Sequence, residues 1–182
     1  MKSIAVYCGA SNGAKPLYAD AARDLARVLV EHNIALVYGG GKVGLMGVIA
    51  DEVLRLGGEA TGVIPRALVE REVGHAGLTR LFVVKDMHER KAMMADLAEG
   101  FIAMPGGFGT LEELFEMVTW SQLGIHAKPI GLLNVDGFYD GLVNFARHQV
   151  QEGFVREGHA GLMQVDADAD ALVKRLRDAD AP

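Results

Sequence analysis

A glycine-rich turn followed at once by two carboxylates offers the clearest chemistry in the chain. It reads Pro105-Gly106-Gly107-Phe108-Gly109-Thr110, and Leu111, Glu112 and Glu113 come directly after it. Glycines at the start of a helix leave backbone N–H groups open, and these groups bind anions at the positive end of the helix dipole. A carboxylate beside a bound anion is useful when another part of the ligand develops positive charge. We therefore expect a phosphate-bearing ligand here, with its chemistry close to Glu113.

The same acidic residues also suit a structural role. Thr110 and Glu113 have the spacing of a capping box, in which the threonine caps the helix and the glutamate bonds back to the cap N–H. Glu112 and Glu116 suit a solvated helix surface near the positive end of the dipole. Spacing alone leaves both interpretations of Glu113 open.

A basic pair follows a second capping-box pattern. Asp86 and Glu89 are spaced to begin a helix, so Arg90 and Lys91 fall in its first turns. Basic side chains there oppose the helix dipole, at a local cost of about 0.3–1 kcal/mol. An external anion would compensate this cost, and a guanidinium binds phosphate in a bidentate manner. A surface ion pair with a nearby glutamate is the alternative, and such pairs contribute little to stability.

An upstream glycine cluster reads Gly39-Gly40-Gly41-Lys42-Val43-Gly44-Leu45-Met46-Gly47. Three of its glycines satisfy the G-x-G-x-x-G pattern of dinucleotide-binding proteins. The cluster follows the second expected strand, however, and the acid expected after the next strand is replaced by Ile64-Pro65-Arg66. An NAD(P)-dependent oxidoreductase is therefore disfavoured. A further anion-binding turn and a tight turn for close helix–strand packing both remain open.

Composition excludes several classes of function. The net charge of −6 provides no field for a nucleic-acid backbone, so we expect no nucleic-acid partner. No apolar run approaches the roughly 20 residues that cross a bilayer, so no membrane partner is expected. The single cysteine, Cys8, is typical of a reducing cytoplasm, where we expect the protein to reside. Neither a metal site nor a resident cofactor is indicated.

Short apolar runs alternate with longer amphipathic stretches. Strands are expected at residues 4–8, 34–38, 60–64, 81–84, 101–104 and 130–133, with a further short one at 163–165, and helices at 16–32, 45–56, 88–99, 110–123, 138–152 and 168–178. Strands that are apolar throughout are covered on both faces, as in a parallel sheet. The sequence therefore predicts one Rossmann-like domain over residues 1–182. Its doubly wound parallel sheet has six to seven strands with helices on both faces, and the chain frays near 179–182.

Taken together, these motifs make the chain similar to the LOG (Lonely Guy) family of cytokinin riboside 5′-monophosphate phosphoribohydrolases, often mislabelled as lysine decarboxylases. The family pattern P-G-G-x-G-T-x-x-E is present at residues 105–113, G-G-G-x-x-G-L-M-G at 39–47 and M-H-x-R-K at 87–91. Cys8-Gly9-Ala10-Ser11 resembles the family's C-G-S-S, with Ala10 as the departure. The resemblance runs from about Ser3 to at least Gly124.

This resemblance implies a function and a set of site residues. The implied reaction is hydrolysis of the N-glycosidic bond of AMP or an N6-modified AMP, with Arg90 and Glu113 as catalytic residues. The nucleotide would be held by Glu72, Lys91, Gly106, Gly107, Phe108, Gly109, Thr110, Leu111, Glu112 and Thr119. From the anion-binding turns we add Gly40, Gly41 and Ser11.

The family also forms homodimers with composite sites. The helix at 110–123, with Leu114, Phe115, Val118 and Trp120, suits such a contact, although core burial explains these residues equally well. Glu72 or Thr119 would lie at the seam between the two copies. The alternative function is a non-catalytic carrier of a nucleotide or of molybdenum cofactor on the same fold.

Overall fold

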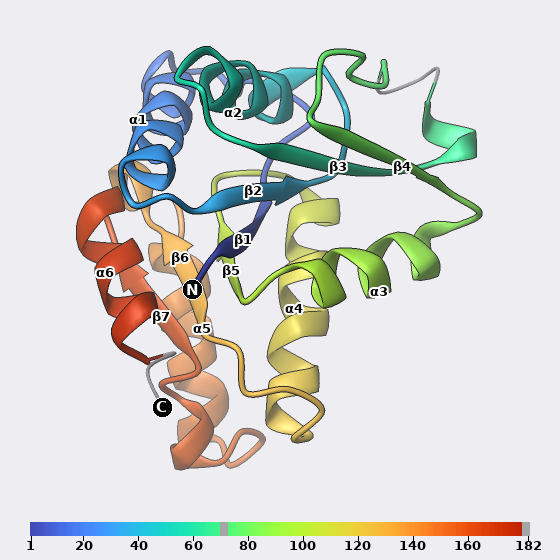
Figure 1. Ribbon diagram of the computed structural model, residues 1–182. Helices are drawn as coiled ribbons and strands as arrows, with labels where there is room; N and C mark the ends of the chain where they lie inside the picture. The colour runs from blue at the N-terminus through green and yellow to red at the C-terminus, as the bar shows by residue number, and fades with distance from the viewer. Residues whose placement is uncertain (70–72, 180–182) are drawn as a thin grey trace.

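The computed structural model describes residues 1–69 and 73–179, which form a seven-stranded, all-parallel sheet with helices on both faces (Figure 1). The strand order is β4-β3-β2-β1-β5-β6-β7. The strands are β1 (Ser3–Tyr7), β2 (Ala35–Tyr38), β3 (Ala60–Pro65), β4 (Arg80–Val84), β5 (Gly100–Ala103), β6 (Ile130–Leu133) and β7 (Met163–Asp166). The helices are α1 (Leu17–Glu31), α2 (Gly44–Arg55), α3 (Met87–Leu97), α4 (Phe108–Gln122), α5 (Asp140–Gln151) and α6 (Ala169–Ala179). The predicted fold class is confirmed.

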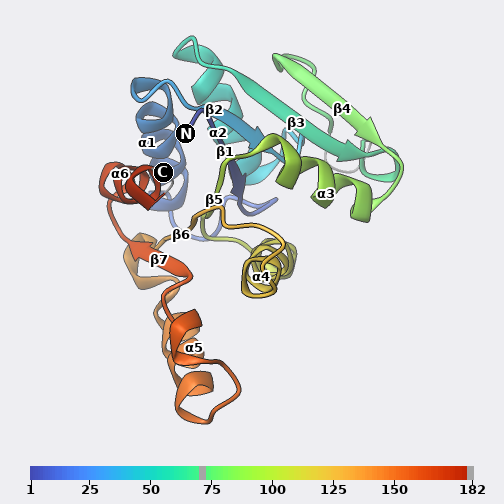
Figure 2. The ribbon, with the colours of Figure 1, turned by 60° about the horizontal axis from the view of Figure 1, so that its bottom comes forward.

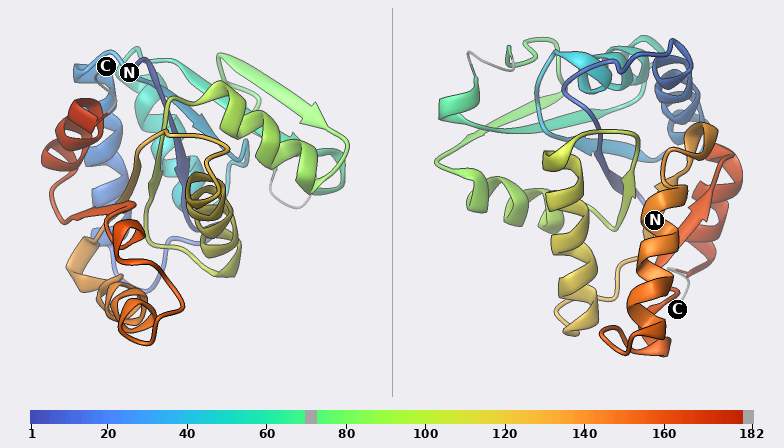
Figure 3. Two further views of the ribbon diagram at one scale, coloured as in Figure 1. Left: turned by 90° about the horizontal axis from the view of Figure 1, so that it is seen from below. Right: turned by 180° about the vertical axis from the view of Figure 1, so that it is seen from behind.

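Alternating side chains of the central strands enter two separate cores. Ile4 and Val6 of β1 pack with α1, α2 and α6, whereas Ala5 and Tyr7 pack with α3, α4 and α5. Figures 2 and 3 show these two helical layers on opposite faces of the sheet. Because nearly all residues of β1, β2, β5 and β6 are buried on one face or the other, these strands are mostly apolar instead of alternating.

β4 differs from this pattern. It was expected to be covered on both faces, but it is an edge strand that pairs with β3 alone in the described sheet. Leu81, Phe82 and Val83 are 37%, 36% and 49% exposed. These side chains are therefore only partly covered by the described residues, and the expectation of full coverage on both faces was wrong for this strand.

Three loops meet where the strand order reverses, between β1 and β5. The loop after β1 is joined to the loop after β5 by a hydrogen bond from Gly9 N–H to the Pro105 carbonyl (3.1 Å). Gly44 opens α2 at φ +58°, and a Cβ there would lie 2.3 Å from the backbone of Ala10. Glycine is thus required for the β2–α2 turn to pack on the β1 loop. Ligands of doubly wound sheets bind at such a reversal.

Candidate active site

A cleft of about 260 Å³ lies at this reversal and contains both expected catalytic side chains. Arg90 enters it from α3 and Glu113 from α4, although 23 positions separate them in the sequence. The lining consists of Cys8, Ala10, Met46, Leu68, Met87, Arg90, Gly107, Gly109, Thr110, Glu112 and Glu113. The fold therefore places a guanidinium, a carboxylate and a helix N-terminus around one space.

A second cleft, of about 420 Å³, adjoins the first. Its lining includes Ser11, Gly106 and the rings of Tyr18 and Phe138, and it shares Ala10 and Gly107 with the first cleft. The two rings meet edge to face, with centroids 6.0 Å apart. The glycine turn thus lies between two neighbouring clefts, and a ligand on the turn has access to both.

The start of α4 differs from the capping-box expectation. The helix begins at Phe108 with Gly107 as its N-cap, so Thr110 lies inside the first turn and caps nothing. Thr110 is only 4% exposed, and a Cβ on Gly106 would lie 2.1 Å from its Oγ1. The capping-box interpretation of Thr110 and Glu113 was wrong, because two glycines allow the helix to begin earlier. The N–H groups of its first turn have no intrahelical acceptor and are available to an anion.

Arg90 is held in the wall of the cleft at 5% exposure. Its Nη2 donates to the Gly39 carbonyl at 3.1 Å, and its Nη1 contacts Met87 Sδ at 3.7 Å. A Cβ on residue 39 would lie 2.0 Å from Nη2, so a side chain there would displace the guanidinium from this position. The upstream glycine cluster therefore serves the active-site arginine. Sequence reasoning missed this function of Gly39.

The N-terminus of α3 is capped as expected. Asp86 accepts a hydrogen bond from Glu89 N–H at 3.0 Å, and the Glu89 carboxylate accepts from Lys85 N–H at 2.7 Å. The glutamate thus reaches back one residue further than in a standard capping box. This cap fixes the first turn of α3 and with it the direction in which Arg90 leaves the helix.

Lys91 points toward α4. Its Nζ is paired with Glu112, and it lies 3.1 Å from Glu116. Burial lowers the pKa of Lys91, but the hydrogen bonds to the two carboxylates outweigh this and raise it overall. Lys91 therefore stays charged and joins α3 to α4, and Glu112 and Glu116 are its partners instead of purely solvated acids.

Two ionisable groups near Arg90 and Glu113 remain neutral. Burial, and after it the Glu113 carboxylate, raises the pKa of the Cys8 thiol far above its usual range. Burial and the same carboxylate likewise raise the pKa of Tyr7. Arg90 opposes both shifts but does not reverse them. Cys8 lines the cleft as a neutral thiol, which is a poor nucleophile.

Other expected site residues lie at different depths. Gly40 and Gly41 are buried in the turn after β2, where the Gly40 carbonyl accepts from His75 N–H (3.0 Å), and neither lines the two clefts. Phe108 is 93% exposed beside the turn, and Thr119 is exposed about three turns further along α4. Leu111 is half-buried against the core. Glu72 lies outside the described residues.

Some lining residues were not anticipated. Met46, Leu68 and Met87 contribute apolar side chains to the first cleft from three different elements. Met46 belongs to the upstream glycine motif, which was the one available signal for its position. Met87 opens the M-H-x-R-K motif at 87–91, whereas no motif includes Leu68.

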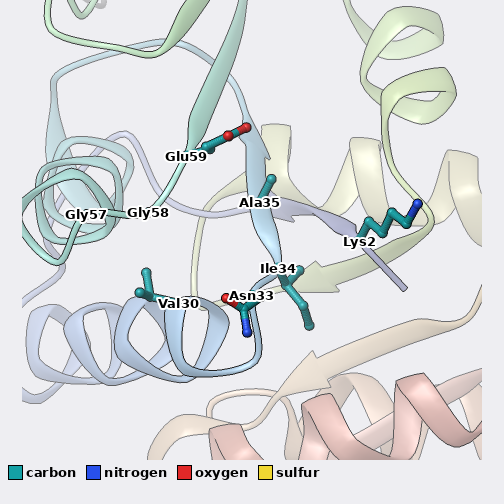
Figure 4. A pocket seen from close by; sticks show the side chains of 8 residues that line it. All are labelled: Lys2, Val30, Asn33, Ile34, Ala35, Gly57, Gly58 and Glu59. Carbon is teal, nitrogen blue, oxygen red and sulfur yellow. The ribbon is translucent and has the colours of Figure 1, made fainter.

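A further hollow, of about 370 Å³, lies at the opposite end of the strands from the two clefts (Figure 4). It is lined by Lys2, Ala35 and Glu59, which lie at or next to the first residues of β1, β2 and β3. Ligands of this fold bind at the carboxyl ends of the strands, so this hollow is not the candidate site. Within residues 1–69 and 73–179, no group of three or more metal-binding side chains lies together, and no helix is long and apolar enough to cross a membrane.

The fold and the cleft together define a Rossmann-like protein in which a glycine turn opens a helix beside an arginine and a glutamate that line one cleft. A family model described as possible lysine decarboxylase matches residues 46–176. The cytokinin riboside 5′-monophosphate phosphoribohydrolase LOG2 of Arabidopsis thaliana is 50% identical over 177 residues, which are 97% of this chain and 83% of that protein. LOG of Oryza sativa subsp. japonica is also 50% identical, over 97% of this chain and 73% of its own. The chain belongs to the LOG family.

Solved structures support the fold independently. The Moco carrier protein of Chlamydomonas reinhardtii has a TM-score of 0.70 at 21% identity, covering 97% of each chain. The molybdenum cofactor binding protein of Rippkaea orientalis has a TM-score of 0.73 at 19% identity, covering 98% of this chain and 97% of its own. At such low identity these similarities establish the architecture alone.

Proposed function

We propose that the chain hydrolyses the N-glycosidic bond of a purine riboside 5′-monophosphate and releases the free base and ribose 5-phosphate. The base is adenine or an N6-modified adenine of the cytokinin type, as the names of the relatives indicate. The observation that carries the proposal is that Arg90 and Glu113 line one cleft beside the open N-terminus of α4. This arrangement supplies a phosphate site and two charged groups next to it.

The phosphate is placed on the turn between the two clefts. Backbone N–H groups of Phe108, Gly109 and Thr110 begin α4 there and favour an anion. Gly106 and Gly107 let the phosphate approach the backbone, and Ser11 faces it from the loop after β1. Contacts of the nucleotide with Gly40, Gly41, Glu72, Lys91, Leu111, Glu112 and Thr119 remain predictions.

The chemistry follows from the charges in the cleft. Water adds to C1′ of the ribose as the C1′–N9 bond breaks, the electron pair leaves with N9, and the proton from water ends on the base. Positive charge develops at C1′ and negative charge on the purine, so a carboxylate and a cation stabilise the two ends. We assign Glu113 to C1′ and the attacking water, and Arg90 to the departing base.

Base release from a nucleotide panel tests this assignment. With AMP and isopentenyl-AMP as substrates, Glu113→Ala and Arg90→Ala are each expected to lower kcat by about 10²–10⁴-fold. Glu157→Ala and Arg156→Ala, at exposed positions near the end of α5, are the matched controls and keep wild-type rates. If both active-site variants keep the wild-type kcat, the catalytic assignment is wrong. If adenosine is cleaved as efficiently as AMP, the phosphate site is wrong.

Two other activities are less well supported. A carrier on this fold would bind the nucleotide without base release, so the same assay separates it from an enzyme. Lysine decarboxylation usually employs pyridoxal phosphate on a lysine. Lys91, the lysine beside the candidate site, is paired with Glu112 and Glu116, which leaves it poorly placed for such a linkage.

We further propose that two copies pair through α4. Phe115, Thr119 and Leu123 follow one another at four-residue spacing along its exposed face, and the two apolar members are 37% and 69% exposed. Leu114, which was expected at the contact, is fully buried in the core and is excluded from it. A twofold contact along this stripe would bring Thr119 to the seam. The cytoplasmic location stays a prediction.

A further inference from the structure

We propose that His75 is a positioning residue for Arg90 and that it acts through the turn at residues 39–41. The inference rests on the catalytic role proposed above for Arg90. His75 lies between β3 and β4 and lines neither of the two clefts to which the nucleotide is assigned. Its side chain is nevertheless buried, at 3% exposure, and both its backbone N–H and its two ring nitrogens form hydrogen bonds.

The turn is held in place by the segment that carries His75. The backbone N–H of His75 donates to the Gly40 carbonyl at 3.0 Å, and Gly41 forms an antiparallel bridge with Gly74. The hydroxyl of Tyr38 adds a bond to the Gly41 carbonyl at 3.1 Å. The position of the turn at residues 39–41 therefore depends on the position of the segment at residues 74–75.

The ring of His75 fixes that segment through both of its nitrogens. Nδ1 accepts a hydrogen bond from Gly77 N–H at 3.1 Å, which places the ring proton on Nε2. Nε2 in turn donates to Asp51 Oδ1 on α2 at 2.8 Å. His75 thus ties the segment to α2, the helix that the turn itself begins.

The turn is in direct contact with the catalytic guanidinium. The Gly39 carbonyl accepts from Arg90 Nη2 at 3.1 Å, with no space for a side chain between them. A shift of the turn therefore moves the acceptor that orients Arg90. A misplacement of about 1 Å in a catalytic group can lower the rate by about 100-fold.

Substitutions of His75 and of its partner Asp51 distinguish a positioning role from a general effect on stability. His75→Leu removes both ring bonds, and we expect kcat for AMP to fall by about 10- to 100-fold with less than about a threefold change in KM. His75→Gln keeps a donor for Asp51, and Asp51→Asn keeps an acceptor for His75, so both are expected within about threefold of the wild-type kcat.

His32 provides the matched control. Its Nε2 is also 2.8 Å from a carboxylate, that of Asp170, in a contact between α1 and α6 at the other end of the sheet. His32→Leu is expected to lower the melting temperature and leave kcat unchanged. In an Arg90→Ala background, His75→Leu is expected to cause no further loss, because the two changes remove the same contribution.

The outcomes distinguish this inference from the proposed function. A wild-type protein that releases no base from any nucleotide contradicts the proposed function. An active wild type whose His75→Leu variant keeps its kcat, as His32→Leu does, contradicts the positioning role. The positioning role is also contradicted if His75→Leu lowers kcat in the Arg90→Ala background by the same factor as in the wild type.

Discussion

Individual glycines shape this site through the atoms they lack. At Gly39 the missing Cβ lets the Arg90 guanidinium lie against the backbone, and at Gly106 it lets Thr110 pack beneath the turn. Neighbouring glycines in the same motif are not equivalent, since a Cβ on Gly107 or Gly109 would meet nothing within 4 Å. The motif therefore mixes positions required for packing with positions that leave space for a ligand.

Substitution of adjacent glycines tests this difference. Gly106→Ala places a methyl group 2.1 Å from Thr110 Oγ1, so we expect a loss of about 1–3 kcal/mol in unfolding free energy. Ribose 5-phosphate binding should weaken as well. Gly107→Ala meets no protein atom, so only the smaller cost of alanine at an N-cap is expected. Urea unfolding and calorimetric titration measure the two effects, and equal destabilisation by both variants would contradict the packing argument.

At this scale the sequence indicated residues that the fold brings to one cleft, but it did not predict their contacts. Arg90 and Glu113 do share a cleft, as the family resemblance implied. The expected cap at Thr110 does not form, because the helix begins earlier, with Gly107 as its N-cap. A glycine N-cap has no side chain to mark it, so the sequence did not predict this start. Lys91 was expected on the nucleotide, yet in this structure it is paired with two carboxylates of α4. Local spacing does not specify which charges will meet across two helices.

Among the elements, α3 carries the clearest terminal signal. Its N-cap Asp86 was predicted from the sequence, and the structure confirms the hydrogen bond to Glu89 N–H. The bond also lowers the pKa of Asp86, because it favours the ionised carboxylate. The same cap sets the first turn from which Arg90 extends.

The lowered pKa predicts how the cap responds to acid. A carboxyl whose folded-state pKa is depressed stabilises the fold above its unfolded pKa, about 3.9, and loses this contribution as the pH falls through the lower folded value. Asp86→Ala is therefore expected to lower the melting temperature at pH 7 and to approach the wild type below about pH 4. Asp86→Asn keeps the acceptor and serves as the control. Thermal unfolding followed by circular dichroism between pH 3 and 7 measures this, and a constant deficit would contradict it.

The order and type of the elements were predictable because each central strand is a short apolar run between helical patterns. Their boundaries agree to within about two residues. The exposure of β4 was not predictable, since Leu81, Phe82 and Val83 have the composition of a buried strand. The sequence of a strand shows that it is apolar, but whether it lies at the edge of the sheet depends on the order of all seven strands.

For the whole molecule, the open question is how many copies associate. The α4 stripe of Phe115, Thr119 and Leu123 leads us to expect a dimer in sedimentation equilibrium at micromolar concentration. Phe115→Lys should shift the mass to that of a monomer, because a charge at a twofold contact is buried twice. Phe154→Lys changes a ring that is 84% exposed beyond α5 and serves as the control. A wild-type monomer, or a Phe115→Lys dimer, would contradict the contact.

The hydrogen bond between Gly9 and Pro105 joins two parts of the chain that are synthesised far apart. β1 is the first strand to be made, but its partner β5 begins at residue 100 and the glycine turn follows it. A nascent chain that ends at β4 contains neither the anion-binding turn nor Glu113. If the proposed site is right, a chain can bind the nucleotide only after α4 has been made, and a chain truncated at β4 should gain no protection from proteolysis when the nucleotide is added.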